Sequence, residues 1–281
     1  MKYEIFPPNL RLNGIVKRYI AVYDISILNE MLFLPNGNNF IIFNRGVNGY
    51  SILHNNEKYK IPECYCISIK TTKSKKAILN LDELPSYEPS IIILVELLPI
   101  GFYKLFHKDA SYLRNQYLAI DNTTTDKYFS NLYMHKSLEK DITYLDNSLL
   151  RMYNDNDNSR ECIENIIEKV VEYNYEITVD ELAQEFGCSR RTIERKFKKF
   201  IGISPKNFIF ICKFYQTFMA YVKDGEKLND TQYIYNDNAH LNKVFHTIVG
   251  YSPSQIFDDI KKNHNLNVYQ LKIAEMEEVY E

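Results

Sequence analysis

Basic side chains are concentrated in one short stretch of this 281-residue chain. Residues 189–213 carry eight of them against a single acid, Glu194. The eight are Arg190, Arg191, Arg195, Lys196, Lys198, Lys199, Lys206 and Lys213. A lone charge run is most simply a solvated helix face, but such a cluster is also typical of a surface that neutralises phosphates. The net charge of -2 does not argue against this, because it says nothing about where the charges lie.

The elements predicted around this cluster are two helices and a short turn. Thr178 followed by Glu181 is a capping box that opens a helix with Leu182, Ala183 and Phe186 on its inner face. Gly187 and Cys188 make the turn, and Ser189 caps the next helix. That second helix turns Ile193 and Phe197 inward and its arginines outward, which is the helix-turn-helix pattern. A preceding amphipathic helix buries Ile163, Ile166, Ile167, Val170 and Val171.

An internal repeat strengthens this interpretation. The segment that begins at Phe197 recurs at Phe245, a constant offset that also pairs Gly202 with Gly250 and Pro205 with Pro253. Each Gly-x-Ser-Pro ends one helix and starts the next. Between the units, Ser204 to about Val222 reads as one long apolar helix that fixes the spacing of two recognition helices. Successive major-groove segments on one face of DNA lie ~34 Å apart, so duplex DNA is the target that this arrangement favours.

Residues 160–262 resemble the DNA-binding domain of AraC/XylS-type transcriptional regulators, in the stretches LAQEFGCSRRTIERKFKKFIGISPKNF and YNDNAHLNKVFHTIVGYSPSQIF. The resemblance implies a seven-helix domain that inserts one helix of each unit into the major groove and activates transcription through RNA polymerase. It also implies which positions read bases. In the first unit these are Arg191, Glu194 and Arg195, and in the second they are Asn238, Ala239, His240 and Lys243.

The chemistry of the first unit agrees with these roles. Arginine can bond guanine O6 and N7 bidentately, and glutamate can accept from cytosine N4. The neighbouring polar and basic residues are better placed to contact phosphates, which gives affinity rather than specificity. These are Ser189, Arg190, Lys196, Lys198 and Lys199. The second unit departs from the pattern. Where the family places an alanine in the supporting helix and a glycine in the turn, this chain has Asp230, preceded by Asn229, and Ile234. Burying Asp230 is costly, so we expect the first unit to dominate binding.

The N-terminal half alternates short apolar runs with turn signals, including Phe40–Phe43, Tyr65–Ile69 and Ile91–Leu98, so strands are expected. FLPNGNNFIIFNRG and SIIILVELLPIGFYKLFHKDASYLRNQYLAID resemble the cupin-like sensor domain of some of these regulators. The expected fold class is multidomain α+β, a cupin-like β-barrel with helices followed by an all-α domain. Aromatic residues here either line a small-molecule cavity or, more simply, form the core. They are Phe33, Phe40, Phe43, Tyr50 and Tyr65.

No cofactor or metal is expected in this half. His54, His107 and His135 show no His-x-His spacing, and a metal-dependent cupin needs clustered histidines with a carboxylate. Cys64 and Cys66 share a strand face, where two core thiols are a simpler interpretation than a metal or redox pair. Five cysteines at no disulfide spacing indicate reduced thiols in a cytoplasmic bacterial protein. Neither a secretory signal nor a membrane span is expected from the apolar runs.

The boundaries follow from changes in pattern. A sensor with a C-terminal helix is expected over residues 1–152, a polar linker over 153–159, the tandem helix-turn-helix over 160–263 and an acidic tail over 264–281. Apolar residues spaced 4, 3, 4, 3 on one helix face end the sensor, and they either form a dimer seam or pack on the sensor itself. They are Leu138, Ile142, Leu145, Leu149 and Met152.

The sequence leaves three classes of function open. The first is a sequence-specific transcriptional regulator, most simply an activator, whose N-terminal domain senses an effector or dimerises. The second is a regulator that acts through protein contacts because its second helix-turn-helix is impaired. The third is an enzyme on the β-rich domain, which ranks last because no nucleophile, acid/base pair or metal ligand set stands in a recognisable arrangement.

Overall fold

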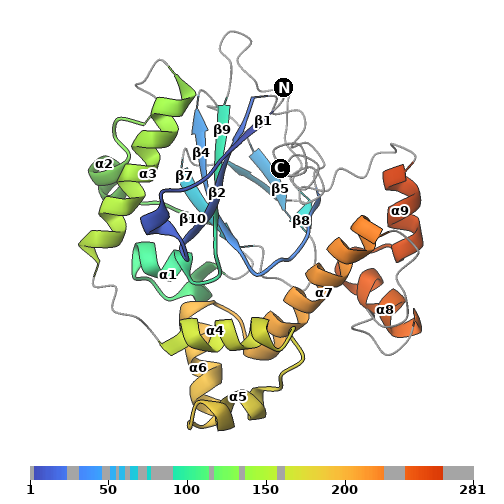
Figure 1. The fold of residues 1–281 in the computed structure, drawn as a ribbon. Coiled ribbons are helices and arrows are strands. Elements are labelled where there is room, and N and C mark those ends of the chain that lie inside the picture. Colours follow the sequence, from blue (N-terminus) through green and yellow to red (C-terminus); the bar gives the residue numbers. More distant parts are fainter. Residues whose placement is uncertain are drawn as a thin grey trace.

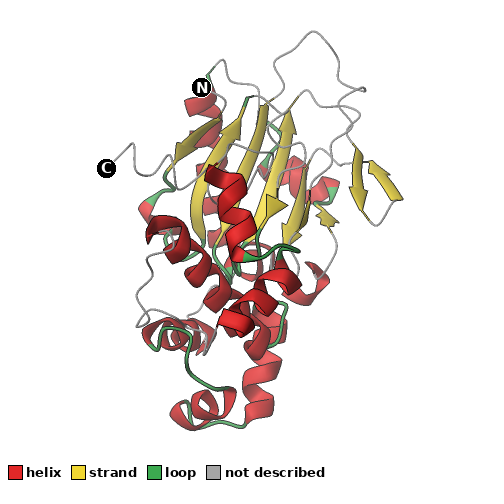
Figure 2. Ribbon diagram, turned by 90° about the vertical axis from the view of Figure 1, so that its right-hand side faces the viewer, coloured by secondary structure: helices red, strands yellow, loops and turns green. Residues whose placement is uncertain are grey.

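The computed structural model describes residues 3–23, 32–45, 51–54, 57–60, 64–68, 75–76, 91–113, 117–132, 137–156, 162–224 and 238–261. It confirms the expected two-domain α+β architecture, with a β-rich N-terminal half and a helical C-terminal half. Figure 1 shows the N-terminal sheet standing above helices α4 to α6, with α7 running from beneath the sheet towards α8 and α9. Seen from the side, the strands of the main sheet form one twisted layer, and a separate short hairpin stands beside it (Figure 2).

A six-stranded antiparallel sheet forms the N-terminal half, in the order β1-β2-β9-β4-β7-β10. Its two central strands are buried on both faces, which explains why their apolar residues run together instead of alternating. The strands are β1 (Tyr3–Phe6), β2 (Val16–Val22), β4 (Asn39–Arg45), β7 (Cys64–Ser68), β9 (Ile91–Leu97) and β10 (Tyr117–Ala119). Two short ribbons pair β3 (Leu32–Phe33) with β8 (Lys75–Lys76), and β5 (Ser51–His54) with β6 (Glu57–Lys60).

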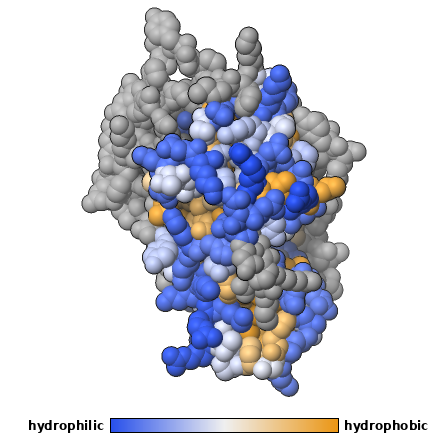
Figure 3. Space-filling view, turned by 90° about the vertical axis from the view of Figure 1, so that its left-hand side faces the viewer, coloured by the Kyte–Doolittle hydropathy of each residue, from blue (hydrophilic) through white to orange (hydrophobic). Residues whose placement is uncertain are grey.

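Helix α3 (Leu138–Asp155) covers one face of the sheet together with α2 (Asn122–Tyr128). The apolar stripe of α3 is turned inward and joins the cluster that contains the sheet residues. Its buried members are Ile142, Leu145, Leu149 and Met152. Figure 3 shows the outer face of this region as mostly hydrophilic, with scattered apolar patches. The stripe therefore packs on its own domain, which is the second of the two interpretations that the sequence left open.

The structure moves one predicted boundary. Helix α3 continues to Asp155, so residues 153–155 are helical and not part of a linker. The extension is held by the Asp155 carboxylate, which accepts from the Tyr128 hydroxyl at 2.8 Å and lies 2.8 Å from the Lys127 ammonium. Asn156 then donates to the carbonyl oxygens of Leu105 and Met152 and so caps the helix end.

The cysteines and aromatics of the sheet are core residues where the structure describes them. Cys64 and Cys66 are free buried thiols in the same cluster, and burial raises the pKa of the Cys66 thiol. Phe43 packs edge-to-face on Phe129 with ring centroids 5.0 Å apart. Of the other aromatics named above, Phe40 and Tyr65 are buried, Phe33 is partly exposed and Tyr50 lies outside the described residues.

Six helices make the described part of the C-terminal half. They are α4 (Cys162–Glu172), α5 (Val179–Glu185), α6 (Arg190–Phe200), α7 (Pro205–Asp224), α8 (Asn238–Ile248) and α9 (Pro253–Lys261). The long connecting helix is confirmed as α7, whose 20 residues span about 30 Å. In α4 the stripe Ile163, Ile166 and Val170 is buried as expected, whereas Val171 is 48% exposed at its edge. None of the described helices is long and apolar enough to cross a membrane.

The N-terminal half contacts the first helical unit through α1 (Gly101–Phe106) and the 3-10 turn η4 (Ala110–Leu113). Tyr103 packs edge-to-face on Phe200 of α6, with ring centroids 4.5 Å apart. Lys104 is almost fully buried, and its ammonium lies 3.5 Å from the Glu164 carboxylate of α4. An aromatic pair and a shielded ion pair thus join the sheet domain to the first unit.

A loop of the N-terminal half, residues 34–38, contacts α7 and the second helical unit. Leu34 has no exposed surface and packs with apolar residues of α7, α8 and α9. Gly37 approaches α7 so closely that a Cβ there would lie 3.1 Å from the Phe208 ring and 3.2 Å from the Cys212 sulfur. The Glu96 carboxylate of β9 accepts hydrogen bonds from the side-chain amides of Asn36 and Asn38 in this loop.

Candidate nucleic-acid interface

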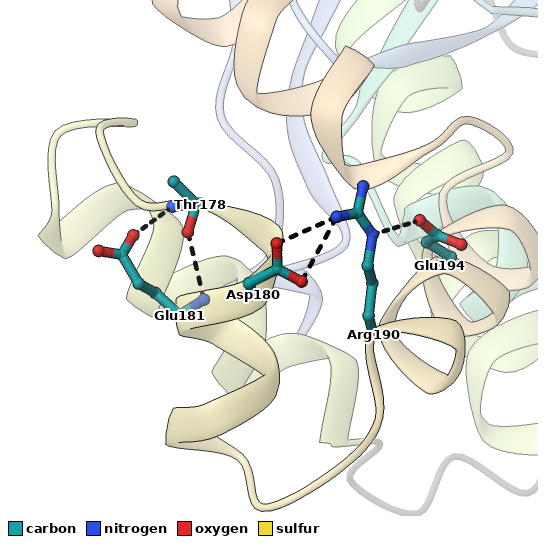
Figure 4. Close-up of polar contacts among 5 residues, drawn as sticks. All are labelled: Thr178, Asp180, Glu181, Arg190 and Glu194. Atoms are coloured by element: carbon teal, nitrogen blue, oxygen red, sulfur yellow. Dashed lines mark hydrogen bonds and ion pairs between the residues drawn. The ribbon is translucent and has the colours of Figure 1, made fainter.

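The first helix-turn-helix is built by the local capping that the sequence predicts (Figure 4). Thr178 begins α5, where its hydroxyl accepts from the Glu181 backbone N–H at 3.2 Å and its own N–H donates to the Glu181 carboxylate at 2.7 Å. The hydrogen bond from the Thr178 N–H holds the pKa of Glu181 below its usual value. Ser189 caps α6 by accepting from the Thr192 N–H at 3.2 Å. Both expected helix starts are confirmed.

Helix α6 has one buried face and one cationic face. Ile193, Phe197 and Phe200 are buried in a cluster shared with α4 and α7. On the opposite side, exposed side chains stand at positions i, i+4 and i+7, which lie on one helix face. They are Arg191, Arg195 and Lys198, and we call them the outward stripe. Within the described residues no acidic partner neutralises any of the three. Of the residues predicted to contact DNA, these three lie together on one exposed helix face.

Arg190 and Glu194 are bound to each other at the flank of α6. The Arg190 Nε donates to the Glu194 carboxylate at 3.0 Å, and its terminal Nη1 donates to both Asp180 oxygens at 3.0 and 3.4 Å. Figure 4 shows Arg190 between the two acids, reaching from α6 to α5. The Glu194 carboxylate, followed by Asp180, raises the pKa of the Arg190 guanidinium above its usual value. Asp180 was not predicted as the partner of Arg190, because the two residues are ten positions apart and no local sequence pattern links them.

The remaining residues predicted to contact phosphates have different surroundings. The Lys199 ammonium lies 5.3 Å from the Tyr103 ring centroid and 4.8 Å from that of Phe200, at cation–π distance. Lys199 thus faces the N-terminal half, away from the outward stripe. Lys196 is partly buried, and the Ser189 hydroxyl is used as a helix cap.

The second unit repeats the first in its apolar framework. Residues of α8 at the predicted spacing are buried with α7 and α9, and Gly250 takes the same positive φ as Gly202. The buried residues are Leu241, Val244, Phe245 and Ile248. Asn238 begins α8, and Ala239, His240 and Lys243 are exposed. Asn229, Asp230, Ile234 and the expected cap Asp237 lie outside the described residues, so the departure in the supporting helix remains a prediction.

A cavity of about 410 Å³ lies between the two halves of the molecule. The N-terminal half contributes Lys17, Asn36 and Asn38 and the turn after β9. The helical half contributes apolar side chains of α4 and α7 together with the carboxylates Glu164 and Glu168. Burial raises the pKa of Tyr175, which also lines it, to about 12, so its hydroxyl is protonated at neutral pH. The cavity was not predicted from the sequence, because its walls come together only where the two domains dock. In the part of the chain that the structure describes, no three His, Cys, Asp or Glu side chains are grouped to hold a metal ion.

Comparison with known proteins agrees with the geometry of the first unit. Residues 172–210, which contain α5 and α6, match bacterial regulatory helix-turn-helix proteins of the AraC family. No curated protein matches the chain. Solved structures to which it is similar include two of ToxT from Vibrio cholerae. The apo form of a ToxT variant is 10% identical, with a TM-score of 0.41 over 91% of this chain and 97% of that chain. Wild-type ToxT bound to an unsaturated fatty acid is 12% identical, with a TM-score of 0.42 over 90% and 94%. By its family match, the first helix-turn-helix of this chain is of the AraC type found in bacterial regulatory proteins.

Proposed function

We propose that this chain is a sequence-specific DNA-binding transcriptional regulator that reads duplex DNA mainly with α6. The observation that carries the proposal is the outward stripe on the recognition helix of an AraC-type unit. Its three exposed cations have no acidic partner among the residues that the structure describes. Arg191 and Arg195 supply base contacts, and Lys196 and Lys198 hold phosphates, whereas the Glu194 carboxylate is bound to Arg190. Activation through RNA polymerase and assembly as a homodimer are parts of this proposal.

Helix α8 takes the same role in the second unit, with Asn238, His240 and Lys243. Its exposed face carries fewer cations than that of α6, so it adds less to affinity. The 30 Å length of α7 suits two helices in successive major-groove segments of one DNA face.

A gel shift with genomic fragments tests the proposal. At physiological salt we expect one or a few fragments to bind at least about a thousandfold more tightly than random duplex of equal length. The double variant Arg191→Ala/Arg195→Ala is expected to lose this preference while keeping the same unfolding midpoint. If no fragment binds above the random duplex, the proposal is wrong.

Single substitutions within the outward stripe separate the two kinds of contact. We expect Arg195→Ala to weaken the best fragment by ~1–3 kcal/mol and to relax preference at particular base pairs. Lys198→Ala is expected to weaken all sequences alike and to lower the slope of log K against log salt by about 1. Titrations of specific and random duplex over a salt series measure both effects. Equal losses on both DNAs for Arg195→Ala would remove its base-reading role.

The cavity between the halves is the proposed effector site. Its volume is within the usual range for small-molecule sites. Its apolar walls carry a few polar groups, two amides, one lysine and two glutamates, and so suit a largely apolar molecule with a polar head. We expect the amphiphilic dye 1-anilinonaphthalene-8-sulfonate to bind there, and Ile167→Trp, which fills the cavity, to abolish the fluorescence gain. Tyr112→Ala, on an exposed side chain outside the lining, is the control. Unchanged binding in Ile167→Trp would exclude the cavity as the dye site.

A regulator that acts only through protein contacts is the second candidate. The apolar stripe of α3, which would have supplied such a contact, is buried against the sheet. No observation on the described residues therefore favours this candidate over DNA binding.

A further inference from the structure

Glu194, the single acid of the recognition helix, pairs with neither of the stripe cations that stand one helical turn from it. Glu194 stands four residues before Lys198 and three after Arg191, and a glutamate four residues before a lysine is a favourable helical pair. In the structure its carboxylate instead accepts from the Arg190 Nε at 3.0 Å. The pairing turns Glu194 away from the stripe and towards α5.

Asp180 explains why Arg190 takes this position. It stands in the first turn of α5 and accepts from the Arg190 Nη1, so two edges of one planar guanidinium are engaged by carboxylates on two helices. A guanidinium presents its donors in a rigid fork, so fixing one edge also orients the other. Asp180 thereby sets where Glu194 finds its hydrogen bond.

We propose that Arg190 is a positioning residue for DNA recognition. Anchored by Asp180, it retains Glu194 at the flank of α6 and so leaves Arg191, Arg195 and Lys198 free to meet DNA. The proposal rests on the proposed function. It replaces the direct phosphate contact that the sequence suggested for Arg190 and the base contact that it suggested for Glu194. The side chains of Asp180, Arg190 and Glu194 are each about half exposed or more. Exposed ion pairs add little stability, so we expect substitutions here to change DNA binding and not folding.

The two roles of Arg190 predict different responses to removal of the Glu194 charge. If Arg190 positions Glu194, then Arg190→Ala releases the carboxylate to neutralise Lys198 or Arg191, and the loss of affinity depends on Glu194 being charged. If Arg190 binds a phosphate directly, its loss is the same whether or not Glu194 is charged. A double-mutant cycle measures this coupling.

The experiment compares the full chain with Arg190→Ala, Glu194→Gln and the double variant, on the best genomic fragment and on random duplex over a salt series. We expect Arg190→Ala to weaken binding about tenfold in the wild-type background and less than about twofold in the Glu194→Gln background. Asp180→Asn is expected to act in the same direction as Arg190→Ala. Lys198→Ala is the matched control, expected to cost the same in both backgrounds, and thermal unfolding checks that every variant is folded.

Equal losses for Arg190→Ala in the two backgrounds would overturn the proposal and restore the phosphate contact. Failure of the proposed function is a separate outcome, in which the wild-type chain prefers no fragment to random duplex. The cycle on random duplex still decides the role of Arg190 in that case, because phosphate neutralisation acts on any sequence.

Discussion

Gly202→Ala is expected to destabilise the chain by about 2–5 kcal/mol and to loosen the contact between its two halves. Gly202 has a φ of +94°, where a side chain is strained, and a Cβ there would lie 2.5 Å from the carbonyl oxygen of Ala110. That oxygen belongs to the backbone of η4, so relief requires either η4 or the end of α6 to move. Urea unfolding measures the loss, and limited proteolysis of residues 157–161 reports the separation of the halves.

The internal repeat supplies a matched control for this substitution. Gly250 occupies the same place in the second unit, with a φ of +87°, but a Cβ there would meet nothing within 4 Å. Gly250→Ala is therefore expected to cost only the backbone strain, about 1–2 kcal/mol, and to leave the proteolysis pattern unchanged. Equal effects of the two substitutions would show that the approach of Gly202 to η4 does not contribute.

Glu96→Leu is expected to cost about 3–5 kcal/mol, since it leaves the buried Arg18 guanidinium without its carboxylate. Glu96 is 2% exposed, and one oxygen lies 3.1 Å from the Arg18 Nε. Its other oxygen accepts from the Asn38 amide at 2.6 Å and from the Asn36 amide at 3.4 Å. The substitution therefore removes a buried charge pair and also releases the loop of residues 34–38. Urea unfolding of the full chain measures the loss.

An exposed ion pair of the same domain is the control. Lys108 and Asp121 lie 3.3 Å apart with about half of each side chain exposed. Lys108→Met is expected to change stability by no more than about 1 kcal/mol. A loss for Glu96→Leu no larger than that of Lys108→Met would mean that Arg18 finds water or another partner when Glu96 is removed.

Structural features that depend on residues close in sequence could be predicted. Features that depend on how helices and the two halves pack together could not. The caps at Thr178 and Ser189 and the inner face of α6 follow from spacing over a few residues, and the structure confirms them. Val171 was misassigned because periodicity alone does not locate the edge of a buried stripe, which depends on the packing of neighbouring helices. The partner of Lys199 is Tyr103, almost a hundred residues earlier in the chain, so the charge pattern around Lys199 gives no indication of it.

The same distinction applies to the candidate site. The sequence identified the outward stripe, because exposed and buried positions alternate with the helical period. It did not separate Arg190 from the other cations, since the distinction depends on the angle at which α5 places Asp180. The interdomain cavity was likewise not foreseen, because its walls come from segments about 200 residues apart.

The position of Leu34 bears on whether the two halves can be exchanged between proteins. A residue of the N-terminal half completes the apolar core of the second helix-turn-helix and has no exposed surface there. The helical half cut out by itself would carry a gap among Phe214, Phe218 and Phe245, and a chimaera with a foreign sensor would fill that gap only if its own loop offered an apolar side chain of similar size. The helical half of this chain is therefore not a free-standing module, because its core includes a side chain of the N-terminal half.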